Sequence, residues 1–100
     1  MNKNSKEEIL VKMLPIVGMT SLRVYIQLVE QYMSAFIHGE PGGEIWFRPD
    51  EKYICKEEGI KPAKYYAILN NLVLLGFVEK SMIKKKLRWR ISYDMMDTIL

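Results

Sequence analysis

The most informative part of the sequence is residues 50–79, DEKYICKEEGIKPAKYYAILNNLVLLGFVE. Asp50 is placed to cap a helix that runs through Glu58, and Gly59 can end this helix in the left-handed conformation. Pro62 suits the first turn of a second helix, because its missing N–H needs no partner there. Apolar residues then recur at helical spacing, up to Gly76: Tyr65, Ile68, Leu69, Leu72 and Leu75. The stretch therefore predicts two short helices joined by a tight turn.

A β-hairpin is predicted directly after this pair of helices. Residues 77–82 and 87–92 have the composition of two strands, and a lysine-rich tip, residues 84–86, separates them. In the second strand Leu87, Trp89 and Ile91 alternate with two arginines, which places the apolar side chains on one face and the arginines on the other. The hairpin is therefore expected to present a basic face.

Upstream of these elements the sequence predicts two further helices and a short strand. A capping-box pattern starts a helix at Ser5, and Pro15 and Gly18 interrupt it. A longer amphipathic helix begins near Thr20 or Ser21 and runs to about residue 38. A turn cluster follows at residues 39–43, and residues 44–48 have the profile of a brief strand. Residues 94–100 are compatible with a short helical tail.

The composition excludes several classes of function. The 100 residues include one cysteine and one histidine. One cysteine excludes an internal disulfide and a zinc cluster, and no further residue is indicated that would support a catalytic cysteine–histidine pair. The longest uncharged stretch is too short to span a bilayer. The sequence therefore predicts a cytoplasmic chain that is not an enzyme, with no cofactor, no membrane association and no indicated small-molecule ligand.

The charge is unevenly distributed along the chain. Residues 1–60 hold 7 Lys and Arg against 9 Asp and Glu, whereas residues 61–100 hold 8 against 3. The second part therefore has a net charge of +5 and the first of −2, from the difference of these counts. This asymmetry indicates one surface that faces a polyanion.

The same residues carry a resemblance to a known family. The run at residues 50–79, with Gly59-Ile60 at the turn, Ile68-Leu69 and Leu72 in the second helix, and Leu75-Gly76-Phe77-Val78 before the hairpin, resembles the winged helix-turn-helix DNA-binding domains of prokaryotic, viral or plasmid regulators. With the helix and strand that precede it, the resemblance covers roughly residues 20 to 92. Two positions depart from the family pattern: Glu58 stands where an apolar residue is usual, and Tyr65 where a smaller one is frequent.

The resemblance implies a mainly α fold with a small β-sheet, a winged helix-turn-helix with an extra N-terminal helix and a short C-terminal helical tail. The domain organisation expected is an N-terminal helical extension at 1–19, the winged helix-turn-helix domain at 20–93 and the tail at 94–100. The recognition helix would be residues 62–75 and the wing residues 77–92. The residues expected to contact DNA are Lys61, Ala63, Lys64, Tyr66, Ala67, Asn70, Asn71, Lys80, Lys84, Lys85, Lys86, Arg88 and Arg90.

The function expected is sequence-specific binding of double-stranded DNA by a transcriptional regulator, with residues 62–75 in the major groove and residues 77–92 on the backbone. A homodimer formed through the terminal helices is expected, because paired half-sites compensate for the few base contacts of one small domain. Two alternatives remain. The first is a DNA-replication initiator or accessory protein of a plasmid or virus, and an origin in a mobile element fits either DNA-binding role. The second is a winged-helix protein–protein interaction module.

Overall fold

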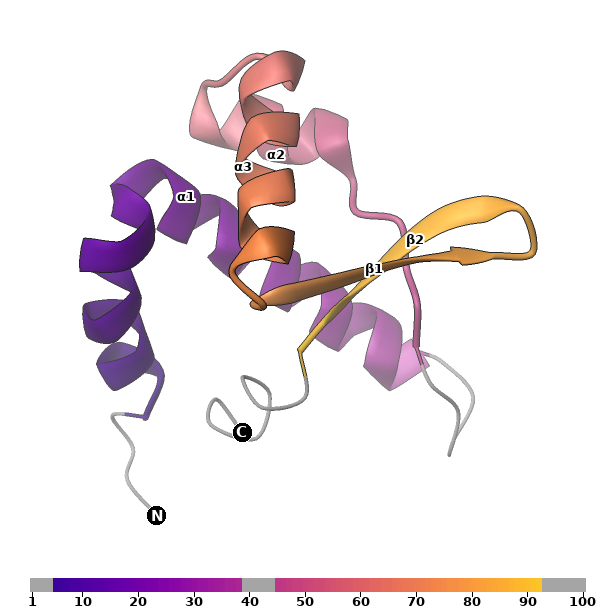
Figure 1. The fold of residues 1–100 in the computed structure, drawn as a ribbon, viewed down its shortest axis with the longest axis horizontal. Helices are drawn as coiled ribbons and strands as arrows, with labels where there is room; N and C mark the ends of the chain where they lie inside the picture. The colour runs from indigo at the N-terminus through magenta and orange to yellow at the C-terminus, as the bar shows by residue number, and fades with distance from the viewer. Residues whose placement is uncertain (1–4, 39–44, 93–100) are drawn as a thin grey trace.

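A computed structural model describes the backbone of residues 5–38 and 45–92 and the side chains of residues 15–35 and 45–92. Over these residues the protein is mainly helical, with a small antiparallel sheet (Figure 1). This confirms the general architecture expected from the sequence. The expected tail at 94–100 lies outside the described residues. The elements, in chain order, are α1 (Ser5–His38), α2 (Glu51–Glu58), α3 (Pro62–Leu74), β1 (Val78–Ile83) and β2 (Lys86–Ile91).

The break expected near Pro15 and Gly18 is a kink within α1. Gly18 has φ 81° and ψ 166°, outside the helical region, whereas helical geometry holds on both sides of it. Glycine adopts a positive φ without the penalty that a Cβ atom imposes. The N-terminal arm, residues 5–17, therefore turns away from the rest of α1 (Figure 1). The expected new start at Thr20 or Ser21 is wrong in detail, because helical geometry resumes directly after Gly18.

The cap signals of α2 and α3 are confirmed. The Asp50 carboxylate accepts a hydrogen bond from the backbone N–H of Tyr53 at 3.1 Å, which satisfies a free donor of the first turn of α2. Gly59 ends the helix with φ 64°, in the left-handed region. Pro62 opens α3 three residues later. The local sequence therefore sets both the lengths of these helices and the tight turn between them.

Glu58 precedes the turn glycine and ties α2 to α1. Its side chain is only 7% exposed, and its carboxylate forms an ion pair with Arg23 of α1, Nε to Oε1, at 2.7 Å. The amide of Gln27, one turn along α1, donates to the other carboxylate oxygen at 3.1 Å. An acidic residue is accepted at this partly enclosed position because α1 supplies both a charge and a hydrogen bond.

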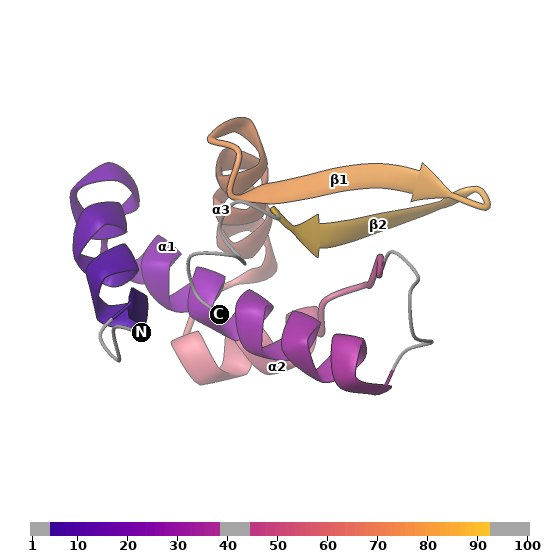
Figure 2. The same ribbon diagram turned by 90° about the horizontal axis from the view of Figure 1, so that it is seen from below.

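The expected hairpin is present, with a turn of two residues. Lys84 and Lys85 both have positive φ, 52° and 67°, and Ile83 pairs with Lys86 across them. These signs of φ are those of a type I′ turn, which matches the twist of a two-stranded ribbon. The hairpin projects from the C-terminal end of α3, on the side opposite the N-terminal arm (Figures 1 and 2).

The strand expected at residues 44–48 is only an isolated bridge. Phe47 pairs with Trp89, and the two residues exchange backbone hydrogen bonds of 2.8 Å in each direction. The chain then reaches buried Pro49 and turns into α2, so pairing extends no further in that direction. One backbone contact of this kind is enough to fix residues 45–48 beside β2.

The core lies between the part of α1 after the kink, α3 and the base of the hairpin. Tyr65 is 2% exposed and belongs to the core, whereas its neighbour Tyr66 is exposed, as their adjacency on a helix predicts. The buried residues are Leu22, Val24, Tyr25, Leu28, Val29, Tyr32, Ile54, Tyr65, Ile68, Leu69, Leu72, Phe77, Val78, Trp89 and Ile91.

Over the residues described, no helix is long and apolar enough to cross a membrane.

Candidate nucleic-acid interface

The exposed face of α3 holds the first group of candidate residues. Its opposite face is buried in the core through four apolar side chains, and this fixes the orientation of the helix. The polar and small residues expected at the surface are therefore free of the core. All seven of these residues are exposed: Lys61, Ala63, Lys64, Tyr66, Ala67, Asn70 and Asn71.

These residues do not all point in the same direction. At 3.6 residues per turn, Tyr66 and Lys64 lie about 160° apart around the helix axis, on opposite flanks of the exposed face. Ala63 and Asn70 lie between them, closer to the Tyr66 flank. The centre of the exposed face therefore holds small residues and Asn70, with the exposed apolar Leu74 at its C-terminal end, an aromatic flank on one side and a cationic flank on the other.

The basic residues of the hairpin divide between its two faces. Residues paired across the two strands point to the same side of the ribbon. Lys80 pairs with Trp89 and so shares the side that packs on the core, whereas Arg88 pairs with Ser81 on the opposite side. Lys84 and Lys85 form the turn. The six basic residues expected to act together thus do not form one continuous patch.

Arg90 is engaged within the protein. Its Nε atom forms an ion pair with Oε2 of Glu79 at 2.7 Å, and its side chain is only 13% exposed. Its guanidinium lies over the ring of Trp46 at 4.4 Å from the ring centroid, which is a cation–π contact. Arg90 therefore joins β1, β2 and the segment before α2, and contributes less to the surface charge than the sequence indicates.

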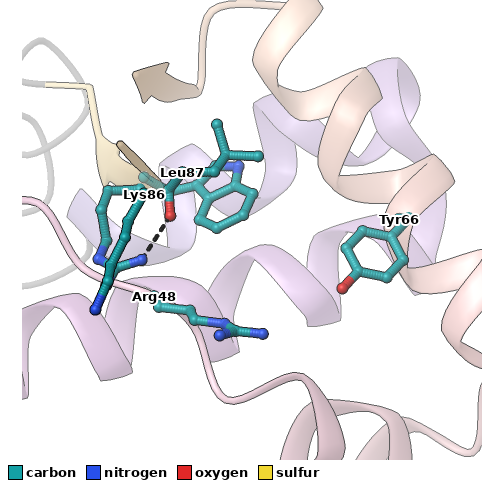
Figure 3. Close-up of a pocket in the computed structure, with 6 residues that line it drawn as sticks. Arg48, Tyr66, Lys86 and Leu87 are labelled. Atoms are coloured by element: carbon teal, nitrogen blue, oxygen red, sulfur yellow. Dashed lines mark hydrogen bonds between the residues drawn. The ribbon is translucent and has the colours of Figure 1, made fainter. Parts of the chain in front are cut away.

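A groove of about 460 Å³ lies between the first half of α3 and residues 86–89 of β2, and we call it the corner groove (Figure 3). One wall comes from Tyr66 of α3 and the other from β2, while Arg48 reaches in from the segment before α2. Arg88 folds back so that its Nη1 donates to the carbonyl oxygen of Leu87 at 2.8 Å. The residues that line the corner groove are Arg48, Tyr66, Lys86, Leu87, Arg88 and Trp89.

Tyr66 has an acidic neighbour that sequence reasoning missed. Its hydroxyl donates a hydrogen bond of 2.7 Å to Oε2 of Glu51, in the first turn of α2. This hydrogen bond raises the pKa of Tyr66, because the carboxylate favours the protonated phenol. Tyr66 is among the residues expected to contact DNA, but its hydroxyl is already engaged in a hydrogen bond within the protein, and a negative charge lies beside the corner groove.

Arg48 is the second residue that sequence reasoning missed. It stands at the end of a short predicted strand, and nothing in the sequence indicates which strand lies beside it. The only available signal is its cationic side chain directly after an apolar segment, Ile45-Trp46-Phe47. Its position beside α3 follows from the bridge between Phe47 and Trp89, which is 42 residues distant in sequence (89 − 47).

Comparisons of the chain with protein-family models, with curated protein sequences and with solved structures gave no match. The function therefore has to be argued from the surface formed by α3, the hairpin and the corner groove. A fold alone does not determine a function, whereas the charge and shape of a surface restrict its ligands.

Proposed function

We propose that this chain is a winged-helix protein that binds double-stranded DNA in a sequence-specific manner and regulates transcription. In this proposal α3 is the recognition helix in the major groove, and the hairpin is the wing on the flanking backbone. One observation carries the proposal. Tyr66, on one flank of the exposed face of α3, and the cations Lys86 and Arg88 of β2 line the corner groove, so the two elements expected to contact DNA border one concave surface.

The dimensions and chemistry of α3 suit a major groove. Such a groove is about 12 Å wide and accepts one α-helix. Ala63 and Ala67 keep the exposed face thin, which allows close approach of the backbone to the bases. Asn70 projects from the same face, and an asparagine amide can pair with the edge of an adenine. Lys61 and Lys64, at the start of the helix, can neutralise phosphates on the groove rim.

The hairpin supplies the sequence-independent part of the proposed affinity. Lys84, Lys85 and Lys86 are all exposed at its tip, within a continuous run of three cations. Each phosphate neutralised by such a side chain releases a counterion, so that binding weakens steeply as the salt concentration rises. The proposal therefore requires a marked dependence on salt, and it requires part of that dependence to come from the tip.

The decisive experiment measures DNA binding with a change at the tip that preserves the turn. Alanine is a poor choice at Lys84 and Lys85, because both have positive φ. The double change Lys84→Asn/Lys85→Gly removes two charges and introduces the sequence that type I′ turns prefer. Binding to a fluorescent duplex of mixed sequence is followed by anisotropy at about 50 and 200 mM salt.

The matched control is Lys52→Gln/Lys56→Gln, on the outer face of α2. These lysines lie on the side of α2 opposite buried Ile54. Glutamine preserves the helix propensity and removes the same number of positive charges as the tip variant. We expect the tip variant to lose affinity and to show a flatter salt dependence, with little effect of the control. Equal effects of the two variants, or no binding by the wild type, would contradict the proposal.

The expected homodimer belongs to the same proposal, because two copies would read paired half-sites. Light scattering of the full chain in concentrated solution measures the oligomeric state directly. A mass near 11.8 kDa, that of one copy, would contradict it.

A protein-interaction module is the second candidate, and one observation favours it. Leu74, at the end of α3, is 85% exposed, and Met82, on the hairpin, is 61% exposed. A contiguous patch of exposed apolar side chains marks a surface that contacts another protein, and these two residues would supply part of such a patch. The anisotropy experiment separates the two candidates, because affinity carried by apolar contacts changes little with salt.

A further inference from the structure

The segment that carries Arg48 is anchored on both sides. Before it, Phe47 exchanges two backbone hydrogen bonds of 2.8 Å with Trp89. After it, Pro49 is buried, and the backbone N–H of Asp50 donates to Oε1 of Gln31 in α1 at 2.7 Å. An exposed arginine on an anchored backbone has a defined place, which lowers the entropy lost when it binds a ligand.

The side chain of Arg48 extends from this segment toward Tyr66 across the corner groove (Figure 3). No carboxylate among the described residues forms an ion pair with its guanidinium, in contrast to Arg23 and Arg90. The nearby carboxylate of Glu51 accepts its hydrogen bond from Tyr66 instead. Arg48 thus offers an accessible guanidinium with its donors available to an anion.

Arg48 shares the corner groove with two more cations, Lys86 and Arg88. Like charges that line one groove repel each other, and an anion placed between them relieves this repulsion. At about 460 Å³ the corner groove is open and larger than one small anion requires. The arrangement therefore suits an extended chain of phosphates that passes through the groove better than a single bound ion.

We propose that Arg48 contacts a backbone phosphate of the DNA strand that runs through the corner groove, between the phosphates held by the hairpin and the bases read by α3. This inference rests on the proposed function. A guanidinium can donate two parallel hydrogen bonds to one phosphate, and this fixes the register of the strand as well as adding affinity. Arg48 would thereby connect the contacts of the hairpin with those of α3 along one DNA strand.

The test compares three single variants in the anisotropy assay with the fluorescent duplex: Arg48→Ala, Arg48→Lys and, as the control for charge, Lys56→Ala. Loss of one phosphate contact reduces the slope of log affinity against log salt by about 0.9. We expect Arg48→Ala to show this reduction and to bind about tenfold more weakly, as for one lost charge-assisted hydrogen bond. Arg48→Lys should retain the slope but lose part of the affinity, because lysine lacks the fork of donors.

Each outcome is distinguishable. Salt-dependent binding by the wild type, with Arg48→Ala equal to Lys56→Ala in affinity and slope, overturns the role of Arg48 and leaves the proposed function standing. No binding of the duplex by the wild type overturns both. A fluorescent polyglutamate peptide serves as the second probe. If it binds in an Arg48-dependent manner while the duplex does not, the groove takes an acidic protein segment and the phosphate assignment is wrong. Thermal unfolding of each variant checks that the fold is retained.

Discussion

Replacing Glu51 by glutamine isolates the acidic charge beside the corner groove. The Glu51 carboxylate lies 2.7 Å from the hydroxyl of Tyr66, which lines the groove. A phosphate bound near that tyrosine would therefore experience repulsion from the carboxylate. Glutamine has nearly the same shape, and its carbonyl oxygen can still accept the hydrogen bond from Tyr66. The change Glu51→Gln thus removes the charge with little change in geometry.

The magnitude follows from Coulomb's law. For unit charges about 7 Å apart, the interaction is about 0.6 kcal/mol at the dielectric constant of water and about 2.4 kcal/mol at an effective value of about 20. The corner groove is open to solvent, so the lower part of this range applies. We expect Glu51→Gln to bind the duplex about three- to tenfold more tightly at low salt. The gain should shrink as salt screens the charge.

The same change should slightly destabilise the fold. Glu51 occupies the first turn of α2, where a negative charge interacts favourably with the helix dipole. Its loss costs about 0.5 kcal/mol, which lowers the Tm by roughly 2–4 °C in a domain of this size. Opposite signs for affinity and stability are therefore expected, and a general effect on folding does not produce that combination.

Anisotropy titration and thermal unfolding measure the two quantities. The control is Glu57→Gln, an exposed acid of the same helix on the flank away from Glu51, and it should leave DNA affinity unchanged. Weaker binding by Glu51→Gln would mean that the carboxylate holds Tyr66 in a conformation needed for contact. That result, or equal effects of the two variants, would refute the electrostatic reasoning.

Three further predictions concern stability. No described residue bonds to the buried hydroxyl of Tyr25, so Tyr25→Phe should raise the free energy of unfolding by about 1 kcal/mol in urea titrations. Burial raises the pKa of Tyr25, so ionisation of the phenol favours the unfolded chain: the free energy of unfolding is unaffected below about pH 10 and falls as the pH rises from there through the raised pKa. The phenylalanine variant should lose less stability in that range. Arg23→Ala should lower the free energy of unfolding by about 1 kcal/mol, because the Glu58 carboxylate stays enclosed without its charge partner. Glu58→Leu should leave the free energy of unfolding nearly unchanged. A larger loss of stability in Glu58→Leu than in Arg23→Ala would contradict this interpretation. Gly59→Ala should lower the free energy of unfolding by about 1–2 kcal/mol because of the positive φ alone, since nothing lies within 4 Å of the added Cβ. Gly59→Asn should lower it less.

The helices around the tight turn could be predicted because their signals are local. A capping aspartate, a glycine with positive φ and a proline at the first helical position each act within one turn of helix. The aspartate and the glycine stand at the two ends of α2, and the proline stands at the start of α3. The division between Tyr65 and Tyr66 follows from helix geometry in the same way. Such features depend on neighbours a few residues away, and these are visible in the sequence.

The candidate site was only partly predictable, because it depends on register between distant segments. The sequence indicates a lysine-rich tip but not which two of its residues form the turn. A shift of one position would change the partner of Arg90, which in this register is Glu79. The position of Arg48 depends on the pairing of Phe47 with Trp89, which no local pattern specifies. Alternation correctly separated the faces of β2, but it gave no indication of an ion pair.

The placement of charge around the corner groove bears on the affinity of the proposed complex, and not on its discrimination between DNA sequences. In that complex Arg48 and the hairpin would contact phosphates, which are identical in every duplex, and would raise affinity without regard to sequence. Glu51 offsets part of that gain at the junction with α3. Removal of its charge should therefore strengthen binding to all duplexes by a similar factor and leave their ratio unchanged. Discrimination would be left to the exposed face of α3, where Asn70 is exposed. In the proposed complex, the carboxylate beside the basic groove would thus keep the sequence-independent part of the affinity moderate, and the contacts to the bases would contribute a larger share of the total.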